Sequence, residues 1–391
     1  MALVIMVISL SLFSGCSDDK GAKAVDKASK EAAKEVSKNA RPLVIGIVGP
    51  ETGDEASYGL SVVEGALAAA KRFNGQGGID GKEIKVIHLD DQNNIELTNK
   101  AVQELIHQGA IAILAAPTGS STFAPVHLVN ESKTIFISVG SRRHLKRSGE
   151  YIFRTAVPDE MATEDLIKYA VTEMGYVNYA LVTAADNDFS LDLSSMFKKA
   201  LNKYQGVIKV EADTYDTFTG GHNLKPVIAA IKKSPDALHG VIFTGSAGEA
   251  VLLAKELRKA GLTLPVIGGE DLFSEEYLQG GEAVNETLFY TTFSADKKSA
   301  KMDEFMADYG KAKPDRFAAL AYDTFMLVAD AIKGAGSTDP AKVREALISR
   351  KDCIGVTGST SFSSENMPIK HPIICKIKRG EKGGEVLLLK Q

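Results

Sequence analysis

The side chains best suited to chemistry stand where apolar segments of the chain end. One segment, AIAILAAP, runs directly into Thr118, Gly119, Ser120 and Ser121, at the point where a helix is expected to begin. The N-terminus of a helix carries about half a positive charge and several unpaired N–H groups, so this turn is suited to hold a carboxylate. Hydroxyls at this position also cap helices, at about 1 kcal/mol each, and the capping interpretation stays open.

Other apolar segments end in the same way. The loops that follow them combine small residues with hydroxyls, amides or single charges, and they are GPETGDEASYG, DDQNN, SVGSRR, AADNDFS, FTGSAGE and GGEDLF. Residues of these kinds suit the recognition of a small polar molecule. Asp90 and Asp91 suggest a metal, but adjacent residues of a strand point to opposite faces, which favours loop or capping roles.

These loops connect strands and helices that alternate regularly from residue 42 onward. Continuous apolar runs such as PLVIGIVGP and YALVTAA alternate with segments of helical spacing such as YGLSVVEGALAAAKRF. Apolar strands separated by amphipathic helices are typical of parallel sheets covered on both faces. Ligands of such sheets bind beyond the carboxyl ends of the strands, which is where the loops above lie.

Composition and motifs narrow the function. The 391 residues carry a formal charge of −4, spread along the chain without a basic stripe, which argues against a nucleic-acid partner. The chain lacks a G-x-S-x-G elbow, a P-loop, an HExxH motif and the Cys/His spacings of structural zinc. We therefore expect a protein that is not an enzyme and that needs neither a cofactor nor a metal.

The N-terminus predicts export. An apolar run at residues 3–13 has the length of a signal peptide, and it ends in LFSGCSDD, with small residues just before Cys16. This resembles a bacterial lipoprotein signal, in which 1–15 is removed, Cys16 is acylated, and the Lys- and Glu-rich 16–40 forms a flexible tether. A plain secretory signal is the alternative. Either way we expect the protein on the outer face of the cytoplasmic membrane or in the periplasm.

Ten short motifs in order carry a resemblance to a known family. They are VGPETG, YG at 58–59, FNGQGGIDGKEI, DDQNN, PTGSST, ISVGS, YIFRT, IGGE, AALAYDTFMLVADAI and GVTGSTSF. Together they resemble the extracytoplasmic solute-binding proteins of branched-chain amino-acid type ABC transporters, the Leu/Ile/Val-binding proteins. That family has the type I periplasmic-binding-protein fold, and the resemblance covers residues 41–391.

The resemblance implies an α/β fold of two Rossmann-like lobes. Each lobe would be a parallel sheet flanked by helices, and three crossings would join the lobes so that they close on a ligand by hinge motion. Lobe 1 is expected at residues 41–156 and 287–352, and lobe 2 at residues 157–285 and 355–391.

The resemblance also implies the ligand contacts. Tyr58 and Phe189 match aromatic residues of the cleft, Gly119 falls where the family has a serine against the ligand carboxylate, and Glu270 matches the carboxylate that receives the ligand ammonium. The whole set of expected contacts is Tyr58, Thr118, Gly119, Ser120, Ser121, Gly140, Ser141, Arg142, Phe189, Ala247 and Glu270. Arg142 stands where the family has a threonine; facing the cleft it would clamp a carboxylate or phosphate, and otherwise it belongs to a surface loop. Glu270 could likewise be a solvated or ion-paired loop residue.

Two cysteines remain beside Cys16. In an exported chain such a pair is expected to be oxidised, so we predict a disulfide between Cys353 and Cys375, although no spacing in the sequence fixes their geometry.

The sequence therefore predicts a monomeric, lipid-anchored binding protein. It would capture an amino acid or a related carboxylated or zwitterionic compound and deliver it to the permease subunits of an ABC transporter. The alternative is the ligand-binding subunit of a sensory or receptor system with the same fold. A cytoplasmic repressor shares the architecture, but the exported N-terminus and the lack of a helix-turn-helix ahead of the first strand count against it.

Overall fold

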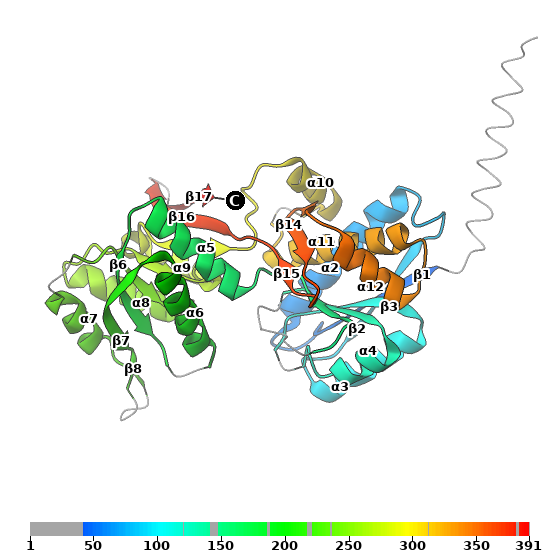
Figure 1. The fold of residues 1–391 in the computed structure, drawn as a ribbon, viewed down its shortest axis with the longest axis horizontal. Helices are drawn as coiled ribbons and strands as arrows, with labels where there is room; N and C mark the ends of the chain where they lie inside the picture. Colours follow the sequence, from blue (N-terminus) through cyan, green and yellow to red (C-terminus); the bar gives the residue numbers. More distant parts are fainter. Residues whose placement is uncertain are drawn as a thin grey trace, which may run out of the picture.

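The computed structural model describes residues 42–390 apart from 120, 141–147, 186–187, 217–220, 235–236, 312 and 381–382. Two α/β lobes lie side by side, and chain segments near the middle of the molecule join them (Figure 1). Among the described residues, no helix combines the length and the apolar character that a membrane crossing requires.

Lobe 1 is built on a five-stranded parallel sheet with the order β2-β1-β3-β4-β5. Its first elements are β1 (Leu43–Gly49), α2 (Ala56–Gly75), β2 (Ile84–Asp90), α3 (Ile95–His107), β3 (Ala110–Ala115), α4 (Val126–Ser132), β4 (Ile135–Ser138) and β5 (Ile152–Arg154). On β1, Ile45 and Ile47 join the core that α2 covers, whereas Val48 joins the core on the α3 face. Both faces of the sheet are buried at β1, β3 and β4, which explains why these strands are apolar throughout.

The chain returns to lobe 1 near its C-terminal end. Helices α10 (Ala300–Tyr309), α11 (Arg316–Ala335) and α12 (Pro340–Ser349) pack beside the N-terminal helices (Figure 1), and a small antiparallel sheet follows, made of β13 (Cys353–Gly355), β14 (Gly358–Phe362) and β15 (Pro368–Ile369). Helices α2 and α11 approach closely because Gly65 lacks a side chain: a Cβ there would lie 2.0 Å from the Ala318 carbonyl oxygen.

Lobe 2 is built on a seven-stranded sheet with the order β17-β16-β12-β11-β10-β6-β7. Strands β7, β6, β10, β11 and β12 pair in parallel, and β16 and β17 add antiparallel. Its elements are α5 (Asp159–Thr172), β6 (Asn178–Thr183), α6 (Asp188–Tyr204), β7 (Val207–Asp213), β8 (Tyr215–Asp216), β9 (Gly221–His222), α7 (Leu224–Lys233), β10 (Gly240–Phe243), α8 (Ala247–Lys259), β11 (Val266–Gly268), η1 (Glu270–Leu272), α9 (Glu275–Leu278), η2 (Gly281–Val284), β12 (Leu288–Thr291), β16 (Ile373–Gly380) and β17 (Gly383–Lys390).

The fold class and the three crossings agree with the sequence-based expectation, but two crossings fall elsewhere in the chain. Strand β12 belongs to the lobe 2 sheet, so the second crossing follows Thr291 rather than residue 285. Strands β13 to β15 stay with lobe 1, where Phe362 packs edge-on against Phe153 at 5.2 Å, so the third crossing follows Ile369 rather than residue 352. The sequences of these strands suit either core, and only their packing decides between the two lobes.

The predicted disulfide is not formed. Cys353 lies on β13 in lobe 1, Cys375 is buried on β16 in the lobe 2 core, and both thiols are free. Burial raises the pKa of the Cys375 thiol to about 12, so it behaves as an unreactive apolar side chain.

Candidate ligand-binding pocket

A cavity of about 480 Å³ lies between the two lobes. Lobe 1 lines it with Glu55, Tyr58, Pro117, Thr118, Gly119, Gly140, Arg316 and Phe317; lobe 2 lines it with Asp159, Asp188, Phe189, Asp192, Leu193, Met196 and Asp271. The lobe 1 residues come from the loops that follow β1, β3 and β4, from the first turn of α2 and from the start of α11. This is the carboxyl edge of the sheet, where a ligand of an α/β protein is expected.

Aromatic rings form the wall on lobe 1. The rings of Tyr58 and Phe317 meet edge-on with centroids 5.1 Å apart, and the Arg316 guanidinium lies over the Phe317 ring at 4.7 Å. Gly140 makes room for this arrangement, because a Cβ there would lie 2.8 Å from Phe317 Cδ1. Asp315 caps α11 by accepting hydrogen bonds from the Phe317 and Ala318 N–H groups at 2.9 and 2.8 Å. The cap fixes the start of the helix that carries Arg316 and Phe317.

The turn after β3 is held by its own hydroxyls. Thr122 Oγ1 donates to the Ala116 carbonyl at 2.7 Å and accepts from the Thr118 N–H at 2.9 Å. Ser121 Oγ lies 2.9 Å from Thr118 Oγ1 and donates to Asn93 Oδ1 at 2.5 Å. The helix expected to begin at this turn begins only at Val126 and is seven residues long. The turn therefore offers hydroxyl and backbone groups to the pocket, and the expected helix N-terminus is not there.

One face of α6 forms the wall on lobe 2. Its pocket-lining residues recur at helical spacing, and they are Asp188, Phe189, Asp192, Leu193 and Met196.

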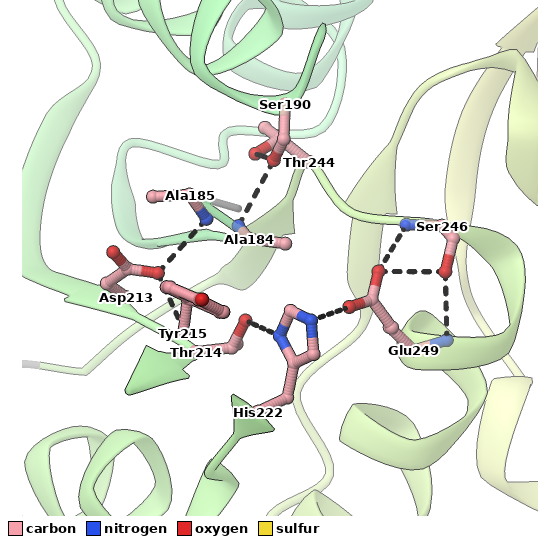
Figure 2. Close-up of polar contacts among 10 residues, drawn as sticks. All are labelled: Ala184, Ala185, Ser190, Asp213, Thr214, Tyr215, His222, Thr244, Ser246 and Glu249. Carbon is pink, nitrogen blue, oxygen red and sulfur yellow. Dashed lines mark hydrogen bonds and ion pairs between the residues drawn. The ribbon is translucent and has the colours of Figure 1, made fainter. Parts of the chain in front are cut away.

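The first turn of α6 is tied to the ends of two strands. Ser190 Oγ accepts from the Ala184 N–H, after β6, at 3.1 Å and lies 3.0 Å from Thr244 Oγ1, after β10 (Figure 2). Next to this contact, Asp213 at the end of β7 accepts from the Ala185 N–H at 3.1 Å. The polar contacts thus set the direction in which the pocket face of α6 points.

Comparison with known proteins decides the family. A family model described as periplasmic binding protein matches residues 42–380. The chain belongs to this family.

Individual relatives agree with this assignment. The Leu/Ile/Val-binding protein homolog 3 of Brucella melitensis is 28% identical over 326 residues, which cover 82% of this chain and 87% of the relative. A putative branched-chain amino acid ABC transporter structure from Rhodospirillum rubrum has a TM-score of 0.80 at 21% identity and covers 89% of this chain and 100% of its own. The structure of the substrate-binding protein LivJ from Streptococcus pneumoniae, in complex with isoleucine, has a TM-score of 0.67 at 25% identity and covers 90% and 100%.

Five of the residues expected to contact a ligand gather around the pocket of this periplasmic binding protein. They are Tyr58, Thr118, Gly119, Gly140 and Phe189. Ser120, Ser141 and Arg142 lie outside the described residues, as does Cys16. Ser121 does not line the pocket, because it is buried and bonded to Asn93 as described above.

Ala247 and Glu270 also lie away from the pocket lining. Ala247 begins α8 behind a capping box of Ser246 and Glu249, whose carboxylate also contacts His222 Nε2 at 2.8 Å (Figure 2), and Ala247 packs into the lobe 2 core. Glu270 is buried, with Oε1 accepting from the Thr292 N–H at 2.6 Å. The neighbouring Asp271 lines the pocket instead.

Several lining residues were not predicted from the sequence, and most of them are charged: Glu55, Asp159, Asp188, Asp192, Asp271 and Arg316. The i, i+1, i+4, i+5, i+8 spacing in DFSLDLSSM is the one signal that could have identified the α6 face. Among the described residues, no group of three His, Cys, Asp or Glu side chains is arranged to hold a metal ion.

The lining acid Asp159 is engaged within the protein. It is buried, and Tyr290 donates its hydroxyl to Oδ1 at 2.8 Å. Burial lowers the pKa of the nearby Arg154 to about 10, and the negative charges of Asp159 and Glu160 oppose that shift. Asp159 therefore stabilises the charged form of Arg154 as well as lining the pocket.

Proposed function

We propose that this periplasmic binding protein captures an amino acid in the pocket between its lobes and delivers it to the permease of an ABC transporter. The observation that carries the proposal is the gathering of Tyr58, Thr118 and Gly119 from one lobe and Phe189 from the other around a single cavity. The relatives support it, because one is named a Leu/Ile/Val-binding protein homolog and another was solved with isoleucine.

The ligand contacts both lobes at once. The Gly119 backbone and the Arg316 guanidinium are donors for a carboxylate on lobe 1, and carboxylates on lobe 2 are acceptors for an ammonium group. A zwitterion that touches both walls binds the closed arrangement better than the open one and shifts the population toward closure. Binding and closure involve no covalent step.

Attachment to the membrane forms the second part of the proposal. Acylation of Cys16 would hold the protein at the outer face of the cytoplasmic membrane, and residues 16–40 would let the lobes reach a permease. A flexible segment of this length spans roughly 25–30 Å. Metabolic labelling with a palmitate analogue tests this step: Cys16→Ser should abolish the label, and equal labelling of both proteins would contradict it.

Calorimetric titration tests the capture. The full-length protein, purified in mild detergent and stripped of bound solute by unfolding and refolding, is titrated with amino acids, amides, dicarboxylates and aromatic acids. We expect a Kd of about 1 μM or tighter for at least one α-amino acid, which corresponds to about 8 kcal/mol. Binding confined to acids that lack an amine, or no binding at all, would contradict the proposal.

A further inference from the structure

The described lining of the pocket is strongly acidic. It contains the carboxylates of Glu55, Asp159, Asp188, Asp192 and Asp271 and a single cation, Arg316. A neutral aliphatic amino acid offers one ammonium group, which needs only a small part of this negative charge. The excess of negative charge is local to the pocket lining, because the whole chain carries a formal charge of only −4 over 391 residues.

Two of these acids are not paired with an opposite charge among the described residues. Asp188 and Asp192 lie one turn apart on the pocket face of α6, both are exposed, and neither forms an ion pair or side-chain hydrogen bond with another described residue. Like charges at this spacing repel each other and weaken the helix. Asp188 also lies at the N-terminus of α6, where a negative charge is favourable for the helix itself. Asp192 has no such structural role.

The apolar lining next to these carboxylates fits an extended aliphatic chain. Phe189, Leu193 and Met196 share the α6 face with them, and Phe189 leaves 39% of its surface exposed. Tyr58 and Phe317 face the same cavity from lobe 1. Amphipathic ligands with an apolar stem and a charged end match such a combination of surfaces.

We propose that the ligand is an amino acid with a positively charged side chain, and that Asp192, together with Asp188, receives this charge. The inference rests on the proposed function, because it assigns a substrate class to the same pocket. The carboxylate of the ligand faces the donors of lobe 1, its stem lies between the aromatic residues, and its terminal ammonium or guanidinium meets the acidic face of α6.

Matched pairs of ligands test the charge directly. L-lysine is compared with L-norleucine, and L-arginine with L-citrulline, by calorimetric titration of the stripped full-length protein; within each pair the molecules differ mainly in the terminal charge. We expect the charged member to bind at least about tenfold more tightly, as for a charge-assisted hydrogen bond in a partly desolvated site. Raising the NaCl concentration should reduce this difference.

Isosteric variants assign the effect to residues. Asp192→Asn should weaken binding of the charged ligand by about tenfold and leave binding of L-norleucine within about twofold. Asp188→Asn should act in the same direction. Asp303→Asn, an exposed acid on α10 outside the pocket lining, is the charge-matched control and should change neither affinity.

The outcomes separate the two proposals. If a neutral amino acid binds as tightly as its charged partner, and Asp192→Asn has no effect, the assignment of substrate class is wrong although the protein captures amino acids. If no amino acid of either kind binds, the proposed function fails, and the substrate class fails with it.

Discussion

The pocket and the hinge, which is formed by the three crossings between the lobes, both contain charged side chains, but the two regions differ in how far other described residues compensate these charges. At the third crossing, Lys370 is buried and donates to Thr357 Oγ1 at 2.5 Å and to the Thr155 carbonyl, on the first crossing, at 3.4 Å. Thr357 in turn donates to Asp323 at 2.5 Å. In the pocket, by contrast, Asp192 is exposed and has no such partner among the described residues.

From this difference we infer that the charges of the hinge stabilise the fold, whereas those on the pocket face of α6 serve ligand binding. Burying a charge is costly unless hydrogen bonds and an opposite charge compensate for it, so the hinge charges are useful only for holding the crossings together. Charges on an exposed pocket wall are solvated until a ligand replaces the water. We therefore expect changes at the hinge to alter stability and its pH dependence, and changes on the α6 face to alter affinity.

The largest expected effect concerns the pH dependence that Lys370 causes. Burial lowers the pKa of Lys370 from 10.5 to about 8; attraction by Asp323 and Glu270 opposes the shift, and repulsion by Lys297 adds to it. Between these pH values the unfolded chain binds a proton that the folded chain does not, so raising the pH favours folding. Relative to Lys370→Met, the free energy of unfolding of the natural protein should rise by up to about 3 kcal/mol from pH 8 to 10.5.

Denaturant unfolding at a series of pH values measures this difference. Lys333→Met, at an exposed lysine of α11, is the matched control and should give a pH profile parallel to that of the natural protein. Parallel profiles for Lys370→Met as well would show that Lys370 does not titrate with a lowered pKa.

A smaller effect is expected where lobe 1 packs tightly behind the pocket. A Cβ at Gly140 would lie 2.7 Å from Pro117 Cγ and 2.8 Å from Phe317 Cδ1. Gly140→Ala should therefore displace the Phe317 ring, lower the free energy of unfolding by about 1–3 kcal/mol and weaken ligand binding.

Gly75→Ala is the control for the change from glycine to alanine. Gly75 is the last residue of α2, and a Cβ there would meet no atom within 4 Å, so the substitution should leave stability within about 1 kcal/mol of the natural protein and affinity unchanged. Equal thermal stability and equal affinity for the two variants would contradict a close fit at Gly140.

The lobe 1 side of the pocket could be predicted from the sequence because its residues stand in short loops after apolar strands. Thr118, Gly119 and Gly140 occupy such loops, and Tyr58 lies in the first turn of the helix that follows one. The carboxyl ends of parallel strands meet at one edge, which brings these residues together. The alternation of strands and helices predicted parallel sheets for the same reason, because burial of both faces leaves a local, continuous signal. The division into two lobes was implied by the family resemblance.

The lobe 2 side could be predicted only in part, because Phe189 was an expected contact and Asp192 was not. Asp188 and Asp192 belong to a helix whose spacing defines a face, but the sequence does not say which face turns toward the other lobe. Glu270 shows that a position after a strand does not by itself place a side chain in the pocket. It follows β11, but its carboxylate points back to the N–H of Thr292. Side-chain direction at a strand end depends on which donors nearby are unpaired, and that depends on tertiary structure.

Glu270→Gln is the smallest change and the sharpest test of this distinction. Glutamine keeps an oxygen that can accept from the Thr292 N–H and the Thr291 hydroxyl, but these hydrogen bonds lose their charge assistance, so the free energy of unfolding should fall by at least about 1 kcal/mol. Because Glu270 does not line the pocket, affinity for the preferred amino acid should change by less than about twofold, against about tenfold for Asp192→Asn. A tenfold loss of affinity for Glu270→Gln, with stability unchanged, would instead mean that this carboxylate turns to the ligand when the lobes close, as the family resemblance implies. Calorimetric titration and denaturant unfolding of the same two variants distinguish these outcomes.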